Sequence, residues 1–277
     1  MKKRAIKTAV ICVSVLLLLA VCFFCNAFFG NPVSKLMARH NAQKYLQSEF
    51  YGTDYEIERV SYDLKTGCYN VYIFSPISQD SSFTVNTNMI GRILYNDYKL
   101  RVNDRWNTAQ RLDAQYRKSV DYLLEKLKYN VTLGYGTLEF DVEEGEALAK
   151  DAVRQSDLEL DKIYNIQEIA RTNGHLVVYI DSDNISLEKA SEILLEIKKL
   201  CDENKIKFYK TDFTLQNEQA DGTTTDDNRI SLRGFLYDDI CEDNLLDKVK
   251  KSYEETHEYF KEQDKIKQEE IESYQKN

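Results

Sequence analysis

The sequence predicts an α+β protein with a single N-terminal transmembrane helix followed by two small α+β domains, in which mainly antiparallel sheets pack against helices. Three observations predict this class. Residues 9–29 form an apolar run without charge, period-two apolar patterns recur in two later blocks, and segments of helical period accompany each block. Neither block has the regular βαβ alternation of a doubly wound nucleotide-binding fold.

The apolar run at 9–29 is the first element, with Ser14 and Asn26 as its strongly polar members. A helix of about 21 residues spans about 30 Å, the hydrocarbon thickness of a bilayer. Basic residues and no acidic ones precede it, namely Lys2, Lys3, Arg4 and Lys7. The positive-inside rule then predicts a cytoplasmic basic tail at 1–8, a single-pass anchor in the cell membrane, and extracytoplasmic domains after it.

Other interpretations of this run stay open. A cleavable signal peptide is favoured by the small residues at 25 and 27, although secretory apolar cores are usually about 7 to 15 residues long. A lipoprotein needs a small residue before the modified cysteine, whereas Val21 precedes Cys22 and Phe24 precedes Cys25. The Cys22–Cys25 spacing is that of redox pairs, but thiols inside an apolar helix act as small hydrophobic groups.

Composition limits the classes of function. The chain carries 37 basic and 46 acidic side chains, and its acidic excess lies beyond the apolar run. Such a surface repels phosphate and anionic lipid headgroups, so we expect no binding of nucleic acid or of a membrane surface. Cys68, Cys201 and Cys241 form no disulfide framework, with a Cys201–Cys241 bridge as the alternative. The three histidines have no metal-ligand spacing, and we expect no metal or other cofactor.

Residues 33–129 are predicted to form the first α+β domain. Pro32 and Ser34 begin a helix with an apolar side, which ends before Gly52. Alternating apolar residues at 55–64, 69–73 and 83–85 predict a three-stranded meander with a break near Arg59. Apolar residues then recur every three or four positions from Trp106 to 127, and we expect this helix to cover the meander.

Residues 130–260 are predicted to form the second α+β domain. The pattern at 131–142, interrupted at Gly136, indicates a strand pair or one bent strand, and 145–154 indicates a short helix. The run at 175–180 is typical of a fully buried strand. A helix to about Asn204, strands at 208–215 and 230–237, and a last helix at 245–260 follow. The charged tail at 261–277 is expected to fray.

We assign no catalytic, cofactor-binding or metal site from the sequence. Asp181 and Asp183 follow a buried strand, where two carboxylates can hold a hard cation, but a turn leading to a helix cap at Ser186 is the preferred interpretation. The acidic loop at 216–228 lacks the ligand spacing of an EF-hand. His175 can titrate near neutrality, yet no nucleophile pairs with it in the sequence, so we expect a structural role. The nucleophile-elbow, zinc-protease, P-loop and dinucleotide motifs do not occur.

Several stretches together carry a family resemblance. They are GNPVSK at 30–35, DYEIE at 54–58, WNT with QRLD at 106–108 and 110–113, GHLVVYI at 174–180, EILLEIKK at 192–199, and FY with DF at 208–209 and 212–213. With these, nearly the whole chain resembles the YfjL-like family of uncharacterised membrane-anchored proteins of Gram-positive bacteria. The resemblance implies an N-terminal anchor and two α+β domains, and it brings no functional residue with it.

We therefore expect a membrane-anchored extracytoplasmic protein that is not an enzyme and that binds a protein or envelope component at the cell envelope. A cell-envelope hydrolase that uses Asp181, Asp183 or His175 is one alternative. A structural or assembly role through the juxtamembrane and transmembrane helices is another.

Overall fold

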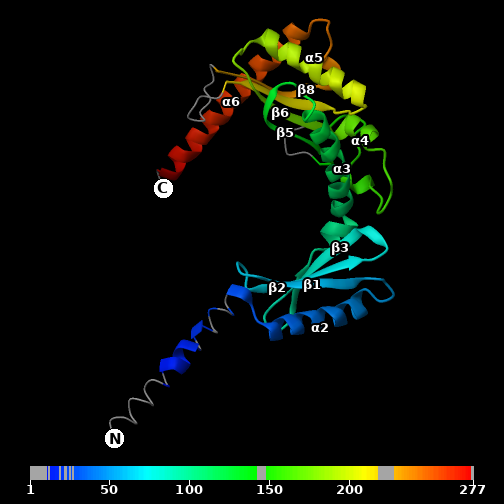
Figure 1. Cartoon of the computed structure of the whole chain (residues 1–277), viewed down its shortest axis with the longest axis vertical. Coiled ribbons are helices and arrows are strands. Elements are labelled where there is room, and N and C mark those ends of the chain that lie inside the picture. The colour runs from blue at the N-terminus through cyan, green and yellow to red at the C-terminus, as the bar shows by residue number, and fades with distance from the viewer. Residues whose placement is uncertain are drawn as a thin grey trace. The chain divides into compact units, whose positions relative to one another are not determined.

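The computed structural model describes residues 11, 13–18, 20–21, 24, 26, 28–141, 148–217 and 228–275 (Figure 1). The chain divides into two compact units, Met1–Thr108 with Glu159–Asp161, and Ala109–Leu158 with Lys162–Asn277. Each unit has its own hydrophobic core and is described by itself. The α+β class with two small, mainly antiparallel sheets is confirmed.

Among the described residues, we find no helix with the length and apolar character that crossing a bilayer requires. The prediction of a transmembrane helix at 9–29 is therefore wrong, and so are the single-pass anchor and the cell-membrane localisation that depend on it. The basic tail at 1–8 and other positions, including Ala9, Cys22 and Cys25, lie outside the described residues.

The first unit packs one helix against an antiparallel sheet of order β1-β2-β3-β4. Asn31 caps α2 (Pro32–Glu49) by accepting a hydrogen bond of 2.7 Å from the Ser34 amide, and Pro32 pre-sets the first turn. Buried residues of α2 face buried strand residues in one core. The strands are β1 (Glu56–Asp63), β2 (Cys68–Ser75), β3 (Ser78–Thr87) and β4 (Ile93–Asn96), and a short π-helical turn, η1 (Lys99–Asn103), follows.

Two details of this sheet bear on the sequence analysis. The register of β1 against β2 shifts between Ile57 and Arg59, which confirms the predicted break near Arg59. The short fourth strand, β4, was not predicted and extends the expected three-stranded meander. The loop Glu159–Asp161 also belongs to this unit. The Asp161 amide donates a hydrogen bond to the carboxylate of buried Asp80, and the Asp161 carboxylate accepts hydrogen bonds from the amides of Gln79 and Asp80.

The second unit contains a sheet of order β5-β6-β7-β8. The parallel pair β6 and β7 lies at its centre, and β5 and β8 pair antiparallel with them. Its other described elements are two short 3-10 turns and four helices. In chain order the elements are α3 (Trp106–Leu124, beginning at the end of the first unit), β5 (Asn130–Leu138), η2 (Gln155–Asp157), α4 (Ile166–Asn173), β6 (Gly174–Asp181), α5 (Leu187–Asn204), β7 (Lys210–Gln216), β8 (Arg229–Leu236), η4 (Tyr237–Asp239) and α6 (Leu245–Gln275).

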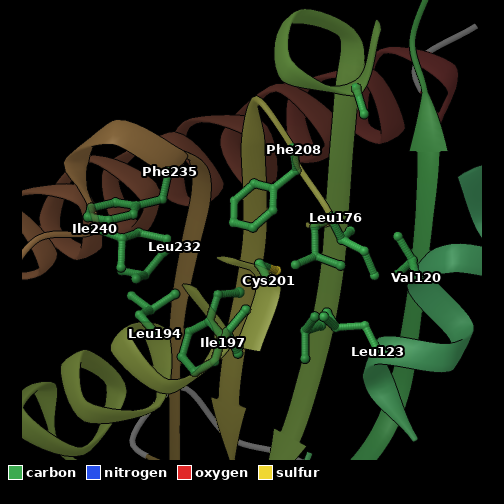
Figure 2. Close-up of a cluster of buried hydrophobic side chains, with 14 of the residues drawn as sticks. Val120, Leu123, Leu176, Leu194, Ile197, Cys201, Phe208, Leu232, Phe235 and Ile240 are labelled. Carbon is green, nitrogen blue, oxygen red and sulfur yellow. The ribbon is translucent and has the colours of Figure 1, made fainter. Parts of the chain in front are cut away.

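Helix α3 contributes its apolar stripe to the core of the second unit, and does not cover the first sheet as expected. Its Leu112, Tyr116 and Val120 are at most 1% exposed and pack with residues of β5, β6 and α5. The reason lies in β5, where a Cβ atom added at Gly136 would lie 2.4 Å from Val120. Glycine at this position lets the helix approach the strand closely. Figure 2 shows side chains of α3 and α5 turned toward the strands in this core.

Other expected elements of this unit also differ. Of the two alternatives for 131–142, the structure shows a single strand, β5, with a register shift between Val131 and Leu133 and no strand pair within the described residues 131–141. Residues 148–154 contain a turn and no helix, and 145–147 lie outside the described residues. Helix α6 continues through the tail that was expected to fray, because its Lys, Glu and Gln residues are good helix formers. Cys68, Cys201 and Cys241 are free thiols, so the alternative bridge does not form.

Candidate functional site

His175 lies at the start of β6 within a cluster of charged side chains. Its Nδ1 is 2.6 Å from Glu139 Oε1, and its Nε2 faces Asp212 Oδ2 at 3.3 Å, short of good hydrogen-bond geometry. Lys210 Nζ lies 2.9 Å from Glu139 Oε2. The cluster is built by strand pairing, since His175 stands opposite Lys210 in the parallel β6–β7 pair, and Asp212 follows on the same face.

The charges of the cluster stabilise one another. Burial alone would lower the pKa of His175, but its contacts with Asp212 and Glu139 outweigh burial and raise the pKa to about 9. Burial alone would raise the pKa of Glu139 and of Asp212, but contacts with His175 lower both. The Lys210 ammonium also lowers the pKa of Glu139, and the hydrogen bond from the Gly234 amide lowers that of Asp212. At neutral pH the cluster therefore holds two cations and two carboxylates.

This arrangement is poorly suited to acid–base catalysis by His175. Both ring nitrogens face carboxylates, the ring is protonated at neutral pH, and its side chain is 13% exposed. A general base needs a free lone pair and a pKa near the working pH. The cluster instead links Glu139, which follows β5, to His175 of β6 and Lys210 of β7. This fits the structural role that the sequence predicts for His175.

The two aspartates named with His175 lie at the other end of β6. Asp181 is six positions further along the strand, which separates it from His175 by about 20 Å. The Ser182 hydroxyl donates a hydrogen bond to the Asn184 carbonyl oxygen and accepts one from the Asn184 amide, and Ser186 caps α5. The predicted turn and cap are therefore confirmed. Within the described ranges no group of metal-ligating side chains is found. The acidic residues at 221, 226 and 227 lie outside the described residues.

The second unit carries an open depression of about 930 Å³ across α5. Its apolar floor includes Leu195, Leu200 and Ile240. Charges of both signs form the rest of its lining, from α5, from the residues after α3 and from those after η4. They are Lys126, Lys128, Glu192, Glu196, Lys198, Lys199, Asp202, Glu203 and Glu242.

Hydrogen bonds fix the walls of this depression. Lys198 Nζ donates to the carbonyl oxygens of Ile240, at 2.6 Å, and Tyr237, at 3.1 Å. On the other side, Lys126 Nζ donates to Asn204 at 2.6 Å. Among the described residues, Lys199 and Glu203 have no ionic partner, so their charges face solvent.

Two family models match the chain. Residues 2–98 match the YfjL-like, N-terminal domain, and residues 115–250 match the YfjL-like C-terminal domain. The chain belongs to the YfjL-like family. The resemblance stated from the sequence is thus confirmed at the level of the family. Searches of the curated proteins and of the solved structures found no match.

The charged cluster of this YfjL-like chain was missed by sequence reasoning, apart from His175. Glu139 lies 36 positions before His175, and Lys210 and Asp212 lie on a later strand. Residues that meet across strands leave no linear motif. One signal was present, because charged residues at alternate positions of a strand that would be buried, as in 210–212, call for partners of opposite charge on the neighbouring strand.

Proposed function

We propose that this YfjL-like chain is a non-enzymatic binding module that docks a protein partner along α5 of its second unit. The observation that supports this function is the open depression of about 930 Å³, with an apolar floor between charged walls. Interfaces between proteins commonly combine an apolar centre with a polar, hydrated rim.

The charges of the depression favour a protein over other classes of partner. Four lysines and five acidic side chains line it, so neither sign prevails. A phosphate backbone or an anionic lipid surface needs a patch of basic residues, whereas a protein surface can present a complementary mixture of both signs. The partner expected here carries an apolar side chain flanked by both acidic and basic residues.

Site-specific photo-crosslinking in cells tests this function. A photoreactive residue replaces Lys199 or Glu203 in the depression, and Lys251 on α6 serves as the exposed control outside it. We expect one discrete adduct from both positions of the depression and none from the control.

A charge-reversed variant makes the test sharper. Lys199→Glu is expected to weaken the adduct formed from position 203, while Lys250→Glu on α6 leaves it unchanged. The same adducts from all three positions, or an adduct insensitive to Lys199→Glu, would contradict docking along α5.

A further inference from the structure

A second cavity lies in the same unit where β7 begins and β8 ends. Its volume is about 480 Å³, within the usual range for small-molecule sites. It shares no lining residue with the depression across α5. Its lining comes from the end of α4, the approach to β7, the end of β8 and the turn after it, and includes Arg171, Thr172, Lys207, Phe208, Tyr209, Tyr237 and Asp238.

Two partly buried tyrosines, Tyr209 and Tyr237, line this cavity beside the buried Phe208, and the Tyr237 ring is held by several contacts. The rings of Phe208 and Tyr237 meet edge to face at 4.8 Å. Lys198 and Lys207 lie 4.6 Å and 5.0 Å from the centre of the Tyr237 ring. The Tyr237 hydroxyl donates to Asp202. A wall fixed in this way loses little freedom when a flat ligand packs against it.

Charge at the cavity comes from Arg171 and Asp238. Lys207 also lines it, but its ammonium is 2.6 Å from Asp202 and thus already neutralised. Arg171 is exposed in the last turn of α4 and has no ionic partner in the part of the chain that the structure describes. Its guanidinium is therefore available to bind a carboxylate with two parallel hydrogen bonds.

We propose that this cavity binds a small aromatic carboxylate. The ligand ring packs against Tyr209 and Tyr237, and its carboxylate pairs with Arg171. Asp238 is placed to accept a hydrogen bond from an ammonium group when the ligand is an aromatic amino acid. This site is independent of the protein docking proposed above, so either can fail without the other.

Three probes that share a phenylethyl group test the proposal by ligand-observed NMR on the full-length chain. They are 3-phenylpropionate, with a carboxylate alone, L-phenylalanine, with a carboxylate and an ammonium, and phenethylamine, with an ammonium alone. We expect the two carboxylates to bind and phenethylamine not to bind. Tighter binding of L-phenylalanine that is lost in Asp238→Asn would identify the amino acid as the ligand class, and equal binding would identify the simple carboxylate.

Arginine variants locate the site. Arg171→Gln is expected to weaken 3-phenylpropionate binding by about tenfold, the size of one charge-assisted contact. Arg154→Gln, at an exposed arginine of the same unit that does not line the cavity, should leave it unchanged. Binding of phenethylamine as strong as that of 3-phenylpropionate, no binding of either carboxylate, or equal effects of the two substitutions would overturn the proposal.

Discussion

His175 lies between two carboxylates, and its titration makes the stability of the second unit depend on pH. Its pKa is raised from 6.5 to about 9, so the folded state favours the protonated ring. Below pH 6.5 the ring is protonated in both the folded and the unfolded chain, and the stabilisation is complete. As pH rises toward 9, the unfolded chain releases its proton first, and the stabilisation is lost.

We expect the free energy of unfolding to fall by on the order of 2 kcal/mol between pH 6 and pH 9.5 through His175, after allowance for solvent screening. Urea unfolding at the two pH values measures it, and His175→Gln is the control because it removes the titrating ring. The same pH dependence in the variant and the original chain would show that the ring does not act in this way.

Glu139 and Asp212 give the opposite dependence in acid. Their pKa values are lowered in the folded chain from the usual 4.5 and 3.8, despite burial, by contacts that include His175. Their contribution to stability is present above these values and is lost as the pH falls through the folded pKa values. The cluster therefore contributes most between about pH 5 and pH 6.5.

At the level of elements, the close packing of α3 on β5 depends on two glycines. A Cβ atom at Gly136 would lie 2.4 Å from Val120 Cγ2 and 2.9 Å from Tyr116, both buried in the core. At Gly134 the nearest atom would be Leu124 Cδ1 at 2.6 Å, the end of a partly buried, flexible side chain. The space beside Gly136 is therefore limited by buried side chains, whereas the space beside Gly134 can widen when the Leu124 side chain moves.

Alanine substitutions test this difference. Gly136→Ala is expected to destabilise the second unit by about 1–3 kcal/mol, the usual cost of overpacking a core. Gly134→Ala should cost clearly less, because the Leu124 side chain can rotate away. Chemical unfolding of both variants measures the two costs. If Gly134→Ala proves as harmful as Gly136→Ala, the approach of α3 is not limited at position 136.

The sequence predicted most helices and strands, because their periodicity is local. The helix that begins at Pro32 and the buried strand at 175–180 are both present. The partner of a helix is not local information: the period of α3 shows which side is apolar but not which sheet it covers. Strand β4 was missed because its four residues are too few for a pattern, and pairing with β3 defines it.

At the level of the whole molecule, two separate cores predict separate unfolding. Ile73 belongs to the first core and Ile180 to the second, and both are at most 1% exposed. Trp106 is the single tryptophan of the chain and lies in the first unit, with Arg101 4.7 Å from its ring. Its fluorescence should therefore report on the first unit.

Ile73→Ala is expected to lower the stability of the first unit by about 2–5 kcal/mol and to shift the unfolding transition seen by Trp106 fluorescence. Ile180→Ala should leave that transition in place and shift the one seen by circular dichroism. Urea titrations with both probes make the comparison. An equal shift of the fluorescence transition by Ile180→Ala would mean that the two units unfold as one.

The candidate sites illustrate why function was harder to predict than fold. His175 was recognisable as a titratable residue, but its pKa depends on Glu139 and Asp212, which strand pairing brings to it from both directions along the chain. The cavity near Tyr237 likewise draws on residues between 149 and 238. Such groupings depend on strand order, and apolar periodicity alone does not determine strand order.

The parallel pairing of β6 with β7 has a consequence for the synthesis of the chain. Strand β6 can pair with β5 as soon as it leaves the ribosome, but β7 comes after α5, and about 35 residues must still be added before β7 is complete. At the usual translation rate of about 5–20 residues per second, this takes roughly 2 to 7 s. During that interval an apolar strand edge is open to other nascent chains. A high density of nascent chains should therefore favour aggregation at β6, and a lower rate of translation initiation should favour soluble folding.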